Sequence, residues 1–204
     1  MIGRLAVSAL VVAGLLLAGP ATASNPVLVS IRVEGKTTTL FGATEPRALA
    51  ATPLAALDAA SRESEVYYHV TRTSFGPYVD QVGRYPASGS AGWVFKVNDL
   101  SPPVGADALE LKAGDRVLWY YADFSSGSGP KTLRLTRVGR TSCYRAVGYD
   151  DGGTASFPEG ALLHVDGRKV QTQGATQAAM GCVGTHRGLV RATAPGMVRS
   201  NALR

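Results

Sequence analysis

The chain has 204 residues, of which 45% are hydrophobic and 18% are charged, and its formal net charge is +6. This apolar fraction is sufficient for a buried core, so the composition excludes a disordered chain, and it also excludes collagen-like, coiled-coil and multi-span membrane proteins. The 24 glycines and 11 prolines favour turn-rich β structure over a helical bundle.

The N-terminal segment has the pattern of a secretory signal peptide. It contains Arg4, an apolar run over residues 5–18, and the small-residue sequence Ala21-Thr22-Ala23 that is typical of a cleavage site. A membrane anchor is the alternative, but this run is shorter than the ~20 residues that span a bilayer. We therefore predict a signal peptide at 1–23 and a secreted, extracellular or cell-surface protein with no membrane span after cleavage.

Residues 24–124 are predicted to form an α+β grasp-like domain, which is a mixed sheet with one helix. Apolar residues alternate over 27–33, which indicates a half-buried strand, and the β-branched stretch 37–41 is its expected partner. Thr52 followed by Pro53 is typical of a helix start, because the hydroxyl caps the first turn and proline lacks an N–H that the first turn leaves unbonded. Further strands are expected at 66–71, 92–98, 108–111 and 116–122.

Residues 125–130 are rich in Ser and Gly and are predicted to be a linker. The domain that follows, 131–204, shows no helical period, and its short strands separated by turn residues favour a small all-β sandwich. Its strands are expected at 132–136, 141–148, 161–165, 170–172 and 188–194. Charge differs across the linker, because residues 24–129 carry 9 basic and 11 acidic side chains, whereas residues 130–204 carry 11 basic and 4 acidic ones.

Four motifs occur in a specific order within the first predicted domain: Phe75-Gly-Pro-Tyr-Val-Asp-Gln-Val82, Gly92-Trp-Val-Phe-Lys-Val-Asn98, Val104-Gly-Ala106 and Gly114-Asp-Arg-Val-Leu-Trp-Tyr120. Over about residues 26–124 the chain resembles a bacterial domain of unknown function, DUF4430-like, that is related to the C-terminal domain of transcobalamin and intrinsic factor. Asp99 departs from the pattern, where the family usually has Gly.

This resemblance implies a grasp-like sheet that binds a ligand. In transcobalamin and intrinsic factor the domain closes over a corrinoid held against a separate helical barrel, and the mature chain here has no room for such a barrel. The motifs at 160–167 and 190–200 are similar to those of small immunoglobulin-like or transthyretin-like sandwiches that accompany the domain in exported proteins. Cobalamin-type binding therefore stays an alternative, and no cofactor is predicted.

Cys143 and Cys182 are the two cysteines of the chain. In an exported protein a single pair of cysteines indicates a disulfide. The alternative is a catalytic thiol with His164 or His186 as its base.

The candidate ligand-binding residues are aromatic and belong to the first predicted domain: Tyr78, Tyr85, Trp93, Phe95, Trp119 and Tyr121. Alternation places Trp119 and Tyr121 on one face of their strand and Tyr120 on the other, so we expect one face to be core and the other to be exposed or to cover a ligand. The two tryptophans are expected in the core. Tyr78, Tyr85 and Tyr121 are expected at the surface, because their hydroxyls need water or a polar partner.

No catalytic residue and no metal ligand is predicted. Asp150 and Asp151 lie next to glycines and are typical of a turn, and the three histidines lack the spacing of a zinc site. The arginines of the second predicted domain are scattered, which favours a solvated surface or contact of residues 131–204 with an anionic cell-wall polymer over nucleic acid. They are Arg134, Arg137, Arg140, Arg145, Arg187, Arg191 and Arg199.

The sequence therefore predicts a secreted, non-enzymatic binding or surface protein that presents an aromatic sheet to a small molecule, a glycan or an envelope protein. The alternatives are a structural or adhesive cell-envelope protein and a small-molecule carrier for corrinoids.

Overall fold

The computed structural model describes residues 24–174 and 178–204, so the predicted signal peptide lies outside the described residues. The described chain contains one helix, α1 (Pro53–Ser64), and is otherwise built from strands and turns. Up to residue 123 the strands are β1 (Val27–Glu34), β2 (Thr39–Phe41), β3 (Arg47–Ala50), β4 (Tyr68–Thr73), β5 (Gly76–Val82), β6 (Tyr85–Pro86), β7 (Ala91–Val97) and β8 (Arg116–Asp123). Those that follow are β9 (Thr132–Arg137), β10 (Cys143–Tyr149), β11 (Ala155–Ser156), β12 (Leu162–Val165), β13 (Arg168–Gln171), β14 (Met180–Cys182), β15 (Val190–Thr193) and β16 (Ala202–Leu203).

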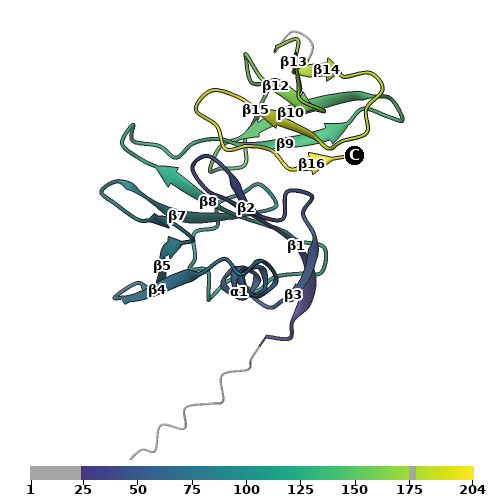
Figure 1. Cartoon of the computed structure of the whole chain (residues 1–204). Coiled ribbons are helices and arrows are strands. Elements are labelled where there is room, and N and C mark those ends of the chain that lie inside the picture. Colours follow the sequence, from purple (N-terminus) through teal and green to yellow (C-terminus); the bar gives the residue numbers. More distant parts are fainter. Residues whose placement is uncertain (1–23, 175–177) are drawn as a thin grey trace, which may run out of the picture.

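A five-stranded sheet is the centre of the molecule. Its order is β2-β1-β8-β7, and β3 also pairs with β1. Strands β1 and β8 are parallel and the other pairs are antiparallel. A smaller sheet, β4-β5-β6, lies beside it (Figure 1). The mixed sheet with one helix is therefore confirmed.

Most of the expected elements are present, with ends shifted by no more than two residues. The expected strand at 108–111 is wrong, because Ala108 and Leu109 turn back onto the carbonyl of Gly105. Six strands were not expected. Among them, β5 begins with Gly76-Pro77, a pair that is typical of a turn, and β6, β11 and β16 are each two residues long.

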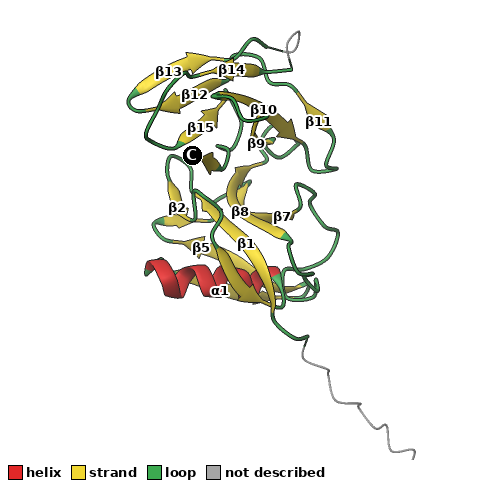
Figure 2. Ribbon diagram, turned by 90° about the vertical axis from the view of Figure 1, so that its right-hand side faces the viewer, coloured by secondary structure: helices red, strands yellow, loops and turns green. Residues whose placement is uncertain are grey.

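Helix α1 covers one face of the central sheet (Figure 2). Thr52 caps it by accepting a hydrogen bond from the Ala55 amide at 3.2 Å, and Pro53 is its first residue, as expected. The helix buries Ala56, Leu57 and Ala60 against the apolar side chains of β1 and β8. This is the main hydrophobic core of the molecule, and we call the side of the sheet that faces it the helix face.

Residues 131–204 form two four-stranded sheets, one with β9, β10, β11 and β14 and the other with β12, β13, β15 and β16. Side chains of both sheets, including Leu135 and Leu163, share one hydrophobic cluster. Cys143 lies opposite Cys182 in the β10–β14 register, and the two form the expected disulfide. The alternative of a catalytic thiol is therefore wrong.

The second side of the central sheet, which we call the polar face, is covered by residues 131–204 (Figure 1). Leu118, Tyr120 and Ala122 of β8 are buried there and pack against Val198. The expectation that this side of the strand is exposed is wrong, because the C-terminal part of the chain lies on it. That it covers a ligand stays a prediction.

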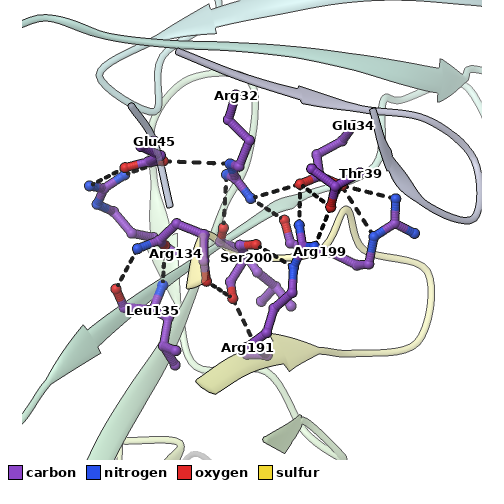
Figure 3. A network of polar contacts seen from close by, with 12 residues as sticks. Arg32, Glu34, Thr39, Glu45, Arg134, Leu135, Arg191, Arg199 and Ser200 are labelled. Carbon is purple, nitrogen blue, oxygen red and sulfur yellow. Dashed lines mark hydrogen bonds and ion pairs between the residues drawn. The ribbon is translucent and has the colours of Figure 1, made fainter. Parts of the chain in front are cut away.

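Ionic side chains of β1 are buried at the same junction. Arg32 is 1% exposed and Glu34 is fully buried, although the alternation of β1 indicated only a half-buried strand. Glu34 pairs with Arg199 at 2.9 Å, with Arg32 at 3.5 Å and with Arg191 (Figure 3).

A second carboxylate, Glu45, belongs to the same network. It pairs with Arg134 at 3.2 Å and with Arg32 at 3.5 Å. Three of the arginines expected on a solvated surface, Arg134, Arg191 and Arg199, therefore bind carboxylates of the N-terminal part instead. Their side chains are less than one-fifth exposed.

Within the described residues, no helix has the length and apolar character needed to cross a bilayer.

A candidate aromatic binding cleft

A cleft of about 370 Å³ opens between β5 and β7, at the seam between the two sheets of the N-terminal part. We call it the aromatic cleft. One wall is formed by Pro77, Tyr78 and Val79 of β5, and the other by Trp93 and Phe95 of β7. Ser101 and Asp151 lie at its polar end. Its volume falls in the range of small-molecule sites.

The cleft exists because β7 is an edge strand, paired with β8 on one side only. The Phe124 amide donates to the Ser90 carbonyl at 3.1 Å and the Asn98 amide donates to the Arg116 carbonyl at 2.9 Å. Antiparallel hydrogen bonding alternates along a strand, so the even-numbered residues of β7 bond to β8 and the odd-numbered ones point their main-chain groups to the open edge. The N–H and C=O of Phe95 therefore face the aromatic cleft.

Four of the six predicted binding residues line the aromatic cleft. Tyr78 is 38% exposed, as expected for a surface residue. Trp93 and Trp119 are each 2% exposed, so they belong to the core as expected, although both also line the cleft. Phe95 is half-buried, and its ring centre lies 5.2 Å from that of Trp119.

Tyr85 and Tyr121 are not at the surface, and that expectation is wrong because both rings lie in the core and both hydroxyls have protein partners. The Tyr121 hydroxyl donates to the Pro86 carbonyl at 3.1 Å, and its ring meets Trp93 edge-on with centres 5.7 Å apart. The Tyr85 hydroxyl bonds to Thr37 at 3.2 Å, and its ring lies over Gly35, where a β-carbon would collide with it. Neither ring lines the aromatic cleft.

The polar end of the aromatic cleft contains a carboxylate from the C-terminal part of the chain. The Ser101 hydroxyl donates to Asp151 Oδ1 at 3.1 Å, and the Tyr120 hydroxyl lies 3.4 Å from the same oxygen. Burial, together with the neighbouring Asp151 charge, raises the pKa of the Tyr120 hydroxyl, so it remains a hydrogen-bond donor at physiological pH. Asp151 is 44% exposed and can still accept a bond from a ligand.

A buried lysine, which the sequence analysis did not single out, positions Asp151. Lys96 of β7 is fully buried, and its Nζ donates to the carbonyls of Tyr149 at 2.9 Å and Asp150 at 2.7 Å. The same nitrogen is 3.6 Å from Asp151 Oδ1. Burial lowers the pKa of Lys96, and the nearby Asp151 carboxylate opposes that shift. The sequence did contain a sign of this role, because Lys96 is the one charged residue in the otherwise apolar strand 91–97.

The histidines lie outside the aromatic cleft. His69 Nδ1 is 2.7 Å from Asp80 Oδ1, His164 Nε2 is 2.8 Å from the Thr193 hydroxyl, and His186 Nε2 is 2.9 Å from the Tyr144 hydroxyl. Among residues 24–174 and 178–204 there is no group of three or more His, Cys, Asp or Glu side chains that could hold a metal ion.

These observations describe a strand-rich α/β protein with one helix and an aromatic cleft at a sheet edge. Residues 51–123, which include both walls of this cleft, match the family described as domain of unknown function (DUF4430). The DUF4430-like resemblance is thus confirmed over this stretch, and no curated protein matches the chain. Solved structures that match include one from Ruminococcus gnavus ATCC 29149, described as a candidate metal binding protein, with 11% identity and a TM-score of 0.36 over 48% of this chain and 97% of that one.

Proposed function

We propose that the mature protein is a secreted, non-enzymatic binding protein whose grasp-like N-terminal domain holds a small planar ligand in the aromatic cleft. The observation that carries this proposal is the cleft itself, where aromatic walls from β5 and β7 end in the paired polar groups of Ser101 and Asp151. A mostly apolar site with few polar groups at one end is the usual form of a small-molecule site.

The side chains of the aromatic cleft define the chemistry of the ligand. Phe95 and Tyr78 offer ring surfaces for stacking, so the ligand needs a flat apolar or aromatic body. Asp151 accepts hydrogen bonds, and the main chain of Phe95 both donates and accepts, so the ligand also carries a hydroxyl or amine group. Aromatic glycosides and hydroxylated aromatic compounds meet both requirements.

In this proposal the C-terminal part, a small β-sandwich, completes the site because it supplies Asp151. Lys96 holds the carbonyls of Tyr149 and Asp150, so it fixes the turn that carries this carboxylate. The cleft is therefore built from both sides of the predicted linker.

Fluorescence titration tests the proposal, since Trp93 and Trp119 report on the aromatic cleft. The mature chain is titrated with a phenyl glycoside, a dihydroxylated aromatic compound, the free sugar and cobalamin. We expect saturable binding of at least one ring-bearing probe, about 10-fold weaker in Phe95→Ala and Tyr78→Ala, a change of ~1.4 kcal/mol. Tyr67→Ala is the matched control, because Tyr67 is 58% exposed and does not line the cleft.

Two results would overturn the ligand proposal: no saturable signal with any ring-bearing probe, or equal affinity in Phe95→Ala and the unmodified chain. Binding of cobalamin with a loss in Phe95→Ala would instead favour the corrinoid carrier.

The proposal of secretion is supported by the signal-peptide pattern and by the disulfide, which fits an oxidising compartment. Sequencing the N-terminus of the protein recovered from culture medium should give Ser24. A protein that is retained in the cytoplasm with Met1 intact would contradict it.

A further inference from the structure

A second cleft, of about 630 Å³, lies between the N-terminal and C-terminal parts of the molecule beside the stretch 124–130. We call it the inter-region cleft. Three basic side chains line it: Lys36 from the loop after β1, Lys131 immediately before β9, and Arg199. Asp123 is the one acidic side chain in its lining among the described residues. We propose that this cleft binds a sugar-sized or polyol ligand through a phosphate or carboxylate group.

The two lysines are available to an anion. Lys36 Nζ lies 4.5 Å from the centre of the Tyr121 ring, a cation–π contact, and Lys131 Nζ donates to the Ser156 hydroxyl at 2.9 Å. Neither ammonium group forms an ion pair with a carboxylate of the described chain. Each can therefore turn toward a ligand without breaking a salt bridge.

The network behind the inter-region cleft carries more positive than negative charge. Four of its arginines pair with Glu34 and Glu45 (Figure 3), and Arg134 also lies 3.9 Å from Asp99, a carboxylate that it shares with a fifth arginine, Arg116. Arg199 belongs to both the network and the cleft lining. Burial lowers the pKa of Arg191, the Glu34 carboxylate opposes that shift, and the neighbouring Arg199 guanidinium adds to it.

The single carboxylate in the lining does not cancel this charge. Asp123 accepts hydrogen bonds from the Ser125 amide at 2.9 Å and the Ser90 hydroxyl at 3.1 Å, and these bonds, with a smaller contribution from Lys36, lower its pKa. It is ionised at neutral pH, but Lys36 and Lys131 outnumber it in the lining even when Arg199 is left out because it is paired with Glu34. A concave site of this sign raises the local concentration of anionic ligands.

The rest of the lining selects a polar ligand of modest size. Ser126 and Ser128 offer hydroxyls, and Gly196, where a β-carbon would meet no atom within 4 Å, allows a ligand close to the main chain. Hydroxyl partners and cations together suit a carbohydrate or polyol that carries an acid group. The cleft would recognise the same hydroxyl and acid groups in a free acidic sugar or polyol and in one repeat of an anionic polymer.

The experiment follows the amide NMR signals of Gly35, Gly129 and Gly196, which line the cleft, in the mature chain. The probes are glycerol 3-phosphate, glucuronate, poly(glycerol phosphate) and, as neutral comparison, glucose. We expect saturable shifts with the anionic probes only. If poly(glycerol phosphate) binds more tightly than glycerol 3-phosphate, the ligand is a repeat of an anionic polymer. If the two bind with equal affinity, the ligand is the free sugar or polyol.

Paired substitutions separate a built site from general attraction. Lys36→Gln with Lys131→Gln should weaken the anionic probes at least 10-fold. Lys112→Gln with Lys169→Gln makes the same change in net charge at two exposed lysines outside the cleft and should leave binding unchanged. Arg199 is not substituted, because its ion pair with the buried Glu34 would be lost.

Equal losses in the two double variants, equal shifts with glucose, or no saturation by any anionic probe would each overturn the proposal. It is independent of the aromatic cleft, so Phe95→Ala should bind the anionic probes normally.

Discussion

The central sheet buries both of its faces, but with opposite chemistry. On the helix face, Val29, Ile31 and Val33 of β1 pack under α1 in an apolar core. On the polar face the same strand presents Arg32 and Glu34, equally buried, to the arginines of the C-terminal part. Alternation along a strand therefore tells which residues share a face, but it does not tell whether water or another part of the chain covers that face.

The two faces should respond differently to substitution, because they are stabilised by different forces. The helix face depends on burial of apolar area, which tolerates changes that conserve volume. The polar face depends on the pairing of charges that have lost their water, so the loss of one partner leaves the others uncompensated.

The largest effect is expected on the helix face. Trp119→Ala removes a 2% exposed ring and the hydrogen bond from its Nε1 to the Pro53 carbonyl at 2.9 Å. We expect the free energy of unfolding to fall by about 3–5 kcal/mol, as measured by urea denaturation. Tyr67→Ala, an exposed aromatic, should change it by less than ~0.5 kcal/mol. A loss below ~1 kcal/mol for Trp119→Ala would show that the helix face is not the main core.

On the polar face, Glu34→Gln keeps the side-chain volume but removes the charge shared by Arg32, Arg191 and Arg199. The outer arginines retain some exposure, 18–19% of their side chains, so we expect the lower end of the range for a broken buried pair, about 3 kcal/mol. The measurement is again urea denaturation. Glu63→Gln, on the exposed side of α1, is the matched control and should be neutral. Identical midpoints for the two variants would contradict a stabilising junction.

These two faces also show what the sequence could predict. The strand at 27–34, the Thr52–Pro53 helix start and the Cys143–Cys182 disulfide follow from local patterns that the fold does not override. The sequence also predicted two core residues of the helix face, because Trp93 and Trp119 are buried there as expected. Four of the six candidate aromatic residues meet in one cleft.

The remaining features depend on contacts between segments distant in sequence. Tyr121 is buried because its hydroxyl reaches Pro86, 35 residues away. Asp151 lies in the aromatic cleft because Lys96 donates a hydrogen bond to the carbonyl of the preceding residue, Asp150. Lys96 and Asp150 are 54 residues apart in the sequence. No local pattern carries such information. The surface expectation was therefore wrong for Tyr121, and the turn prediction for Asp151 was right but did not reveal its place in the aromatic cleft.

The Cys143–Cys182 disulfide lies in the C-terminal part that covers the polar face, but it is not part of the ionic network. Replacing Cys143 and Cys182 together by Ser removes the β10–β14 crosslink, which closes a loop with a sequence separation of 39. The loss of unfolding free energy should be about 2–4 kcal/mol. Thermal unfolding of the reduced and oxidised unmodified chain gives the control, because it removes the same bond without a substitution. Equal melting temperatures in the two states would contradict this effect.

The smallest effect is expected for a carboxylate of the smaller sheet that is partly exposed to water. Asp80 on β5 accepts hydrogen bonds from the Thr71 hydroxyl and from His69, and these bonds lower its pKa. A carboxylate whose pKa is lowered in the folded state stabilises the fold above its unfolded pKa, about 4, and loses that contribution as the pH falls through the folded value. Asp80→Asn should therefore flatten the acid limb of stability below pH ~4 and cost no more than ~1 kcal/mol at neutral pH. Since the same formal charge is removed in Glu34→Gln, a larger loss in Asp80→Asn would mean that burial does not set the difference between the two sites.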